Sequence, residues 1–245
     1  MSISEAYTSY YIDENGLLCI PDPASRGVRV ISYADTQRLL TMPETLPHTV
    51  SHLNINYCEH VERLPELPRA LRSLYIVGTG VSELPELPPE LSVLGMSGTK
   101  ITELPDVLPD ALVDLGINMT RGIRHVNLPA GIKTFVASGS DMEGVVEIGE
   151  DITGLDLSYT KVTDVVMTTI SERMVRLNVS HSLVTEVPIP AYGEDMIYLN
   201  ISFTGISRLG DLNDNLKQLD VRHTNIPSEE IDALAAARPN LIIIR

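Results

Sequence analysis

The amino-acid sequence repeats a short apolar pattern about every twenty residues, and this repetition limits what the chain can fold into. The segment Leu71-x-x-Leu74-x-Ile76 recurs as Leu91-x-x-Leu94-x-Met96. The same register continues in both directions and gives eleven repeats, nearly all of 20 to 22 residues, that begin at Tyr7, Val28, Val50, Leu71, Leu91, Leu112, Ile132, Ile152, Met174, Met196 and Leu216. Repeats this short bury their apolar side chains only by stacking on one another. We therefore expect a single stacked domain over residues 1–245.

Positions within the repeat indicate its local structure. The first, fourth and sixth residues are apolar, and the alternation of the fourth and sixth predicts a short strand with one buried face. The ninth residue is small and in most repeats polar, so it can hydrogen-bond the backbone of neighbouring turns. Cys58 occupies this ninth position, and we expect it to be structural rather than a nucleophile. Many repeats then end in proline, as in Leu84-Pro85, which blocks a helical return and favours extended, polyproline-like backbone.

The two ends of the array have their own signals. At the C-terminus, residues 228–238 are rich in alanine, begin with Ser228 as a candidate N-cap and precede Pro239, which predicts a capping helix. The apolar residues 241–245 follow as a final strand that closes the sheet. At the N-terminus, Tyr10 and Ile12 already occupy repeat positions, so we expect the array to begin at residue 7 with no separate helical cap.

The consensus Leu-x-x-Leu-x-Ile-x-x-Thr-x-Val-x-x-Leu-Pro resembles the leucine-rich repeat in its short bacterial LPX subtype. It is similar to the repeat regions of the YopM and IpaH type effectors that pathogens inject through type III secretion. The resemblance implies an α/β leucine-rich repeat solenoid with parallel strands on a concave face, an extended convex side and one C-terminal capping helix. The ligase members of that group resemble a repeat region followed by a catalytic domain, which this sequence lacks, so we expect no ligase activity.

Composition excludes several classes of function. The formal net charge is −15, from 18 Lys and Arg against 33 Asp and Glu. This charge repels phosphate backbones, so we expect no nucleic-acid partner. Apolar runs are far shorter than the roughly 20 residues of a membrane span, and we expect no membrane association. The two cysteines, Cys19 and Cys58, form no disulfide framework, and the N-terminus lacks a classical signal peptide. We expect a bacterial cytoplasmic location before any export, with the host cytosol as a further site of action.

The concave face carries the candidate site. Its side chains come from the second, third, fifth, seventh and eighth residues of each repeat. In the last four full repeats the eighth residues form an aromatic and imidazole column, and polar residues stand beside it. This partner-binding patch consists of Tyr159, His181, Phe203, His223, Asp156, Asn178, Asn200, Asp220, Arg222 and Arg176. Aromatic side chains beside adaptable amides are typical of protein recognition surfaces. The alternative is that neighbouring repeats stack similar side chains only for stability.

Two further groups lie on the predicted concave face. A secondary candidate for partner binding consists of Asn54, Asn56, Tyr57 and Tyr75. Glycines fill many concave positions in the middle repeats, namely Gly78, Gly95, Gly98, Gly116 and Gly139. Their missing side chains either let a partner approach the strands closely or relieve strain in the turn after each strand. His181 and His223 lie two repeats apart, too far for a tight shared metal site, so we expect no metal, no cofactor and no catalytic residues.

These observations favour a non-enzymatic scaffold that binds another protein through its concave face, and the resemblance implies a bacterial effector that acts on host proteins. One alternative is a bacterial or phage intracellular assembly protein with no host target. Another is a recruiting subunit for an enzyme that a partner supplies. The sequence leaves the partner's identity and the oligomeric state open.

Overall fold

The computed structural model describes residues 10–20, 28–34, 36–167, 173–186 and 195–245. The polypeptide divides into two compact units. The N-terminal unit comprises Met1–Leu112 with Thr120–Gly122, and the C-terminal unit comprises Val113–Met119 with Ile123–Arg245. The assignment of all eleven repeats to a single domain stays a prediction.

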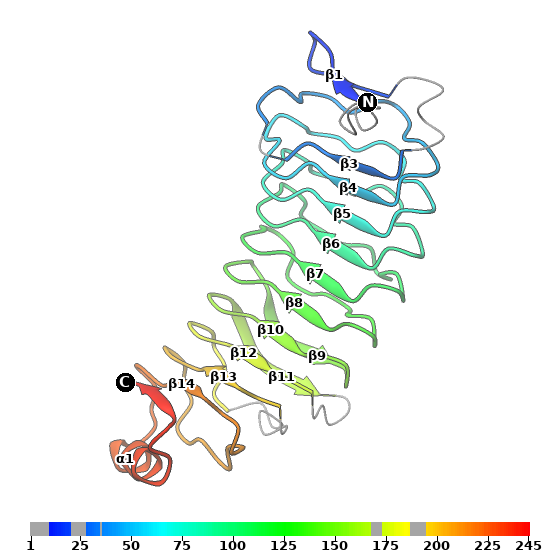
Figure 1. The fold of residues 1–245 in the computed structure, drawn as a ribbon. Coiled ribbons are helices and arrows are strands. Elements are labelled where there is room, and N and C mark those ends of the chain that lie inside the picture. The colour runs from blue at the N-terminus through cyan, green and yellow to red at the C-terminus, as the bar shows by residue number, and fades with distance from the viewer. Residues whose placement is uncertain (1–9, 21–27, 35, 168–172, 187–194) are drawn as a thin grey trace, which may run out of the picture. The chain divides into compact units, whose positions relative to one another are not determined.

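In the N-terminal unit, one three-residue strand from each coil pairs in parallel with the next (Figure 1). The strands are β3 (Val30–Ser32), β4 (His52–Asn54), β5 (Ser73–Tyr75) and β6 (Val93–Gly95). Each begins at the third residue of a predicted repeat, as the alternation of apolar residues requires. The register is constant, because Leu53 pairs with Leu74 and Leu74 with Leu94. This is the predicted solenoid of parallel strands.

The C-terminal unit continues the pattern and adds a second, smaller sheet (Figure 1). Its main parallel strands are β7 (Asp114–Gly116), β8 (Thr134–Val136), β10 (Gly154–Asp156), β12 (Arg176–Asn178), β13 (Tyr198–Asn200), β14 (Gln218–Asp220) and β15 (Ile242–Ile244). On the return side, β9 (Glu143–Ile148) and β11 (Lys161–Met167) pair in parallel with each other. The sequence predicts extended backbone here, and the valine-rich segments favour a true strand pair.

The core lies between the strands and the return segments. The first, fourth and sixth residues of the coils fill it, and Leu71, Leu74 and Ile76 are fully buried. Burial of such a side chain contributes about 1.5 to 3 kcal/mol of transfer free energy. The ninth residues lie beneath the turn, where Thr79, Thr99 and Thr160 each donate a hydrogen bond to the carbonyl three residues earlier. Most ninth residues therefore close their own turn, whereas the Cys58 thiol donates to the Tyr33 carbonyl of the preceding coil.

The N-terminal end differs from the prediction. Tyr10 and Ile12 do not begin a strand of the main sheet. Instead, β1 (Tyr11–Ile12) and β2 (Leu18–Cys19) form an antiparallel hairpin. The turn forms because the Asp13 carboxylate accepts hydrogen bonds from the backbone N–H groups of Asn15 and Leu17, both at 2.9 Å. Gly16 completes it with a φ of +77°, a conformation that favours glycine. The predicted start at residue 7 lies outside the described residues.

The predicted C-terminal helix is α1 (Ser228–Ala237), and β15 follows it as the last strand of the sheet. The expected N-cap is wrong, because Pro227 is the capping residue and Ser228 is the first residue of the helix. Proline suits this position, since it has no N–H group to leave unpaired. Glu229 and Glu230 lie in the first turn, where their charge complements the helix dipole. The Glu230 carboxylate also accepts a hydrogen bond from the Leu209 N–H at 2.8 Å, which ties the helix to the coils.

Candidate functional site

The structure brings the four predicted aromatic and imidazole residues into one continuous stack, here called the aromatic ladder. It consists of Tyr159, His181, Phe203 and His223. The ring centroids of Tyr159 and His181 are 4.2 Å apart, those of His181 and Phe203 4.0 Å, and those of Phe203 and His223 4.3 Å. The ladder is open to solvent, since Tyr159 is 61% and Phe203 38% exposed. Rings that stack at this distance contribute about 0.5 to 1.5 kcal/mol per pair.

The ladder residues share an unusual backbone conformation. All four have a positive φ, which is 56° at Tyr159, 53° at His181, 57° at Phe203 and 52° at His223. The eighth residue of other coils has the same conformation, namely Tyr57, Gly78, Gly98, Met119 and Gly139. The turn after each strand therefore requires a left-handed residue, and a non-glycine residue there is strained. The recurrence of glycine in this column is the sequence signal for that requirement.

Side chains of the preceding coil fill the space above several of the glycines. A Cβ atom on Gly78 would lie 2.9 Å from the Tyr57 ring, and one on Gly139 would lie 2.6 Å from the Met119 sulfur. A Cβ atom on Gly95 would lie 3.0 Å from the Tyr75 ring. These glycines accommodate large neighbours of this chain. At Gly78 and Gly139 the structure thus favours the turn explanation over an open approach for a partner, whereas Gly95 lies in β6 and makes room for the Tyr75 ring.

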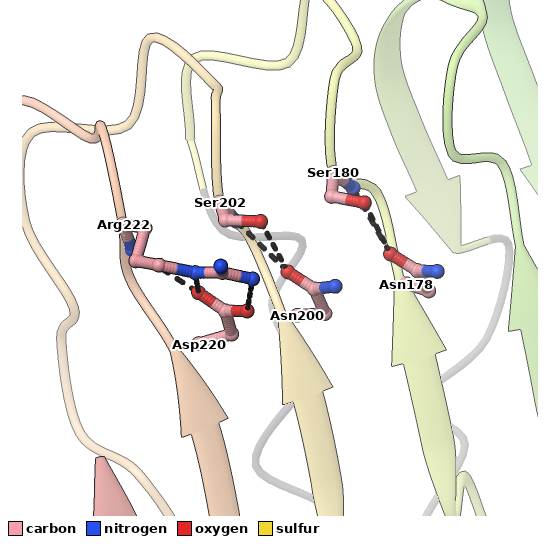
Figure 2. Close-up of polar contacts among 6 residues, drawn as sticks. All are labelled: Asn178, Ser180, Asn200, Ser202, Asp220 and Arg222. Atoms are coloured by element: carbon pink, nitrogen blue, oxygen red, sulfur yellow. Dashed lines mark hydrogen bonds and ion pairs between the residues drawn. The ribbon is translucent and has the colours of Figure 1, made fainter. Parts of the chain in front are cut away.

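The polar residues beside the ladder hold the turns that follow the strands (Figure 2). The Oδ1 atom of Asn200 accepts hydrogen bonds from the backbone N–H and the hydroxyl of Ser202, at 3.1 and 2.7 Å. Asn178 does the same for Ser180, at 3.2 and 2.8 Å. Asp156 repeats this arrangement with Ser158. Counting Asp220, which accepts the Arg222 N–H, four predicted partner-binding residues therefore have one oxygen engaged in their own turn.

Asp220 and Arg222 form the last pair of this series and the only one with two charges among those drawn in Figure 2. Arg222 donates from Nε to Oδ1 at 3.0 Å and from Nη2 to Oδ2 at 2.7 Å. The hydrogen bonds and charge of Asp220 raise the pKa of Arg222 above its ordinary value. Both charges of the pair are thus matched within the coil, which leaves neither for a partner's counter-ion.

Arg176 has a different environment. Its guanidinium carbon lies 5.1 Å from the centre of the Tyr198 ring on the neighbouring strand, a cation–π contact. Beside it a recess of about 280 Å³ opens in the face of the sheet between β8, β10, β12 and β13. Gly154, Val136 and Tyr198 line this recess with Arg176 and Asp156. Of the lining residues, Asp156, Arg176 and Asn178 belong to the predicted patch, whereas Thr134, Val136, Gly154, Leu155 and Tyr198 were not predicted.

The secondary candidate belongs to the N-terminal unit. Asn54 accepts a hydrogen bond from the Asn56 N–H at 3.1 Å, and Asn56 accepts one from the Val77 N–H of the next coil at 2.8 Å. Tyr57 and Tyr75 expose 54% and 37% of their surface. The two asparagines are therefore engaged with backbone, and the two tyrosine rings are the part of this cluster that faces solvent.

A cluster of metal ligands or a membrane-spanning helix would indicate another kind of site. Within the described ranges, no three His, Cys, Asp or Glu side chains gather as metal ligands would. In the same part of the chain, no helix has the length and apolar character to cross a bilayer. Burial raises the pKa of the Asp114 carboxyl on β7 above its ordinary value.

Comparison with solved structures places this geometry in a known fold. YopM from Yersinia enterocolitica WA-314 superposes with a TM-score of 0.65 at 25% identity, over 81% of this chain and 47% of that protein's chain. YopM from Yersinia pestis, described as a leucine-rich effector protein, superposes with a TM-score of 0.71 at 22% identity, over 91% and 67% of the two chains. The chain has the leucine-rich repeat fold.

The fold is shared beyond these two proteins. An internalin from Listeria monocytogenes superposes with a TM-score of 0.51 at 12% identity, over 94% of this chain and 79% of its own. The leucine-rich repeat chain spans about half the length of the Y. enterocolitica YopM structure that it matches. No protein-family model and no curated protein matches the sequence.

Proposed function

We propose that this leucine-rich repeat chain is a non-enzymatic scaffold that binds another protein through the strand face of its C-terminal unit. This face consists of the outward side chains of β7, β8, β10, β12, β13 and β14 together with the aromatic ladder. The likeness to YopM supports the further proposal that the chain is a bacterial effector that acts on host proteins. In that case it is made in the bacterial cytoplasm and works in the host cytosol.

The observation that carries the proposal is the exposed aromatic ladder. The turn accepts glycine at the eighth position, as Gly78, Gly98 and Gly139 show. Four coils in succession instead hold a large ring there, in a backbone conformation that costs on the order of 1 kcal/mol per residue. Stacking offsets this cost but does not require the rings to face solvent. Rigid exposed rings are the anchors that protein interfaces use most.

A pull-down with mass spectrometry tests the proposal. The bait is the native protein or a variant with Tyr159→Gly, His181→Gly and Phe203→Gly, and bacterial and host lysates are used separately. Glycine is the suitable replacement because it adopts the positive φ without strain. Met119→Gly is the matched control, since Met119 has the same conformation and is 62% exposed outside the ladder.

We expect a partner that the native protein and the Met119→Gly control retain and the ladder variant loses. Capture from the host lysate would support the effector role. Capture from the bacterial lysate alone would support an intracellular assembly role with no host target. Partners that bind all three baits equally, with the ladder variant folded by circular dichroism, would remove the ladder as the binding surface.

A further inference from the structure

Packing against neighbouring atoms does not require a glycine at position 154. Gly154 is the first residue of β10, and it pairs with Thr134 on one side and with Arg176 on the other. A Cβ atom there would meet only the Thr134 methyl group, at an ordinary contact distance of 3.7 Å. Its backbone is not in the left-handed region, unlike that of Gly78 or Gly139. A glycine that neither sterics nor backbone demands suggests space kept for an incoming group.

The two charged residues of the recess, Asp156 and Arg176, differ in whether their side chains already have hydrogen-bond partners. Asp156 accepts hydrogen bonds at both oxygens, from the Ser158 N–H and hydroxyl at 2.9 and 2.6 Å and from the Asn178 amide at 3.2 Å. Arg176 stacks on the Tyr198 ring, and among the described residues no carboxylate pairs with it. Stacking holds the guanidinium in place while its five N–H donors stay open to an acceptor. The recess therefore offers the open donors of Arg176, whereas both oxygens of Asp156 already accept hydrogen bonds.

Two lysines lie next to the strands around the recess. Lys133 lies beside Gly154, whose N–H donates to the Lys133 carbonyl, and Lys217 lies beside Tyr198, since its N–H donates to the Ile197 carbonyl. Both lysines are exposed. Of the carboxylates on these strands, Asp220 is paired with Arg222, whereas Asp156 keeps its negative charge because its hydrogen-bond donors are neutral. Arg176 therefore lies on a strand between two exposed lysines, one before β8 and one before β14, in a chain whose net charge is −15.

We propose that this recess binds the carboxylate side chain of an acidic protein segment that lies across β10 and β12. This proposal rests on the proposed function and names the chemistry of its partner. The Arg176 guanidinium pairs with the incoming carboxylate, and Val136 and the Tyr198 ring contact its aliphatic stem. A protein segment fits better than a nucleic acid, because an extended phosphate backbone would meet the acidic remainder of the chain.

Selection from a phage-displayed library of random dodecapeptides tests the proposal. The immobilised baits are the native protein, Arg176→Gln and Arg208→Gln. Arg208 is the matched control, because it loses the same charge at a site where it pairs with Glu186 at 4.0 Å, away from the strands. We expect the native protein and Arg208→Gln to enrich peptides with Asp or Glu at one fixed position, and Arg176→Gln to lose that preference.

Fluorescence anisotropy with the most enriched acidic peptide then locates the contact. Gly154→Leu fills the recess and leaves Arg176 in place, and we expect it to weaken binding roughly tenfold. Replacing the fixed acidic residue of the peptide by its amide should weaken binding to the native protein by a similar factor. The same replacement should have no further effect on Arg176→Gln, since the two changes remove one interaction.

The outcomes separate the two proposals. Peptides that need the aromatic ladder but show no acidic preference would overturn the recess proposal and leave the proposed function standing. An acidic preference that persists in Arg176→Gln would also overturn it. If the native protein enriches no peptide and captures no partner from either lysate, both proposals fail.

Discussion

Arg222 binds Asp220 through two charge-assisted hydrogen bonds within one turn, and the same carboxylate also accepts the Arg222 backbone N–H at 3.2 Å. Asn178 and Asn200 accept the corresponding N–H groups in the two preceding coils. The backbone bond thus recurs from coil to coil, whereas the ion pair is an addition in the last of them. Since the Arg222 side chain is exposed, the ion pair contributes little to stability.

This difference predicts which of two substitutions at Asp220 destabilises the protein more. Asp220→Asn keeps the oxygen that accepts the backbone N–H, so we expect it to lower the free energy of unfolding by less than about 1 kcal/mol. Asp220→Ala leaves that N–H without its partner and should cost about 1 to 3 kcal/mol. Urea unfolding followed by circular dichroism measures both. Equal losses in the two variants would show that the side-chain oxygen does not hold the turn.

Phe203 tests the cost of the left-handed turn. Its φ is +57°, a conformation that glycine adopts freely and alanine does not. Phe203→Ala and Phe203→Gly both lose the ring stack, but only alanine keeps the strain. We expect the glycine variant to be more stable than the alanine variant by roughly 1 kcal/mol in urea unfolding.

A helical position, where alanine is normally more stable than glycine, supplies the control for this test. In the interior of α1, Ala235→Gly should lower stability by about 1 kcal/mol, because glycine is a poor helix former. Glycine less stable than alanine at both sites would mean that residue 203 does not hold the left-handed conformation in solution.

Gly78 and Gly98 have nearly the same φ, +66° and +67°, but different surroundings. A Cβ atom on Gly78 meets the Tyr57 ring at 2.9 Å, whereas one on Gly98 meets only the backbone of Gly78 at 3.9 Å. We expect Gly98→Ala to cost about 1 kcal/mol from strain alone. Gly78→Ala should cost roughly 1 to 3 kcal/mol more, because the ring must move.

A double-mutant cycle separates the ring from the strain. In a Tyr57→Ala background, the Gly78→Ala cost should fall to that of Gly98→Ala, and Gly98→Ala itself should be unaffected. Additive effects of Tyr57→Ala and Gly78→Ala would show that the two coils do not pack as described.

The strands of the main sheet were predictable because their signal repeats. The fourth and sixth residues alternate in every coil, so a chance match in one coil is corrected by its neighbours. The N-terminal hairpin has no such redundancy. Tyr10 and Ile12 mimic repeat positions, and the decisive contact is the Asp13 carboxylate that reverses the chain. A local turn that competes with a repeat pattern at its edge is decided by a few hydrogen bonds.

The sequence could predict which residues of the candidate site align from coil to coil. It could not predict which of their polar groups lack a partner within the chain. The eighth-position column gave the aromatic ladder because coils in a constant register align like positions. Which polar groups remain available depends on side-chain geometry within each coil. Asp156 and Arg176 carry opposite charges in adjacent strands, yet Asp156 accepts hydrogen bonds from its own turn and from Asn178, whereas Arg176 stacks on a tyrosine ring. The recess itself depends on Gly154, whose role is visible only once its neighbours are placed.

Asp114 gives the fold a pH dependence with a defined sign. Burial raises the pKa of this carboxyl above its ordinary value of 3.8, so the folded protein holds the proton at a pH where the unfolded chain has released it. The stabilising contribution of the protonated form is complete below about pH 3.8 and is lost as the pH rises through the raised pKa. Asp114→Asn carries no charge at any pH. We therefore expect its stability relative to the native protein to grow between about pH 3 and about pH 7 in urea unfolding.

Asp110→Asn removes an exposed carboxylate and controls for the loss of one negative charge from this acidic chain. A difference between Asp114→Asn and the native protein that stays constant or shrinks over this range would show that Asp114 is not desolvated in the folded state.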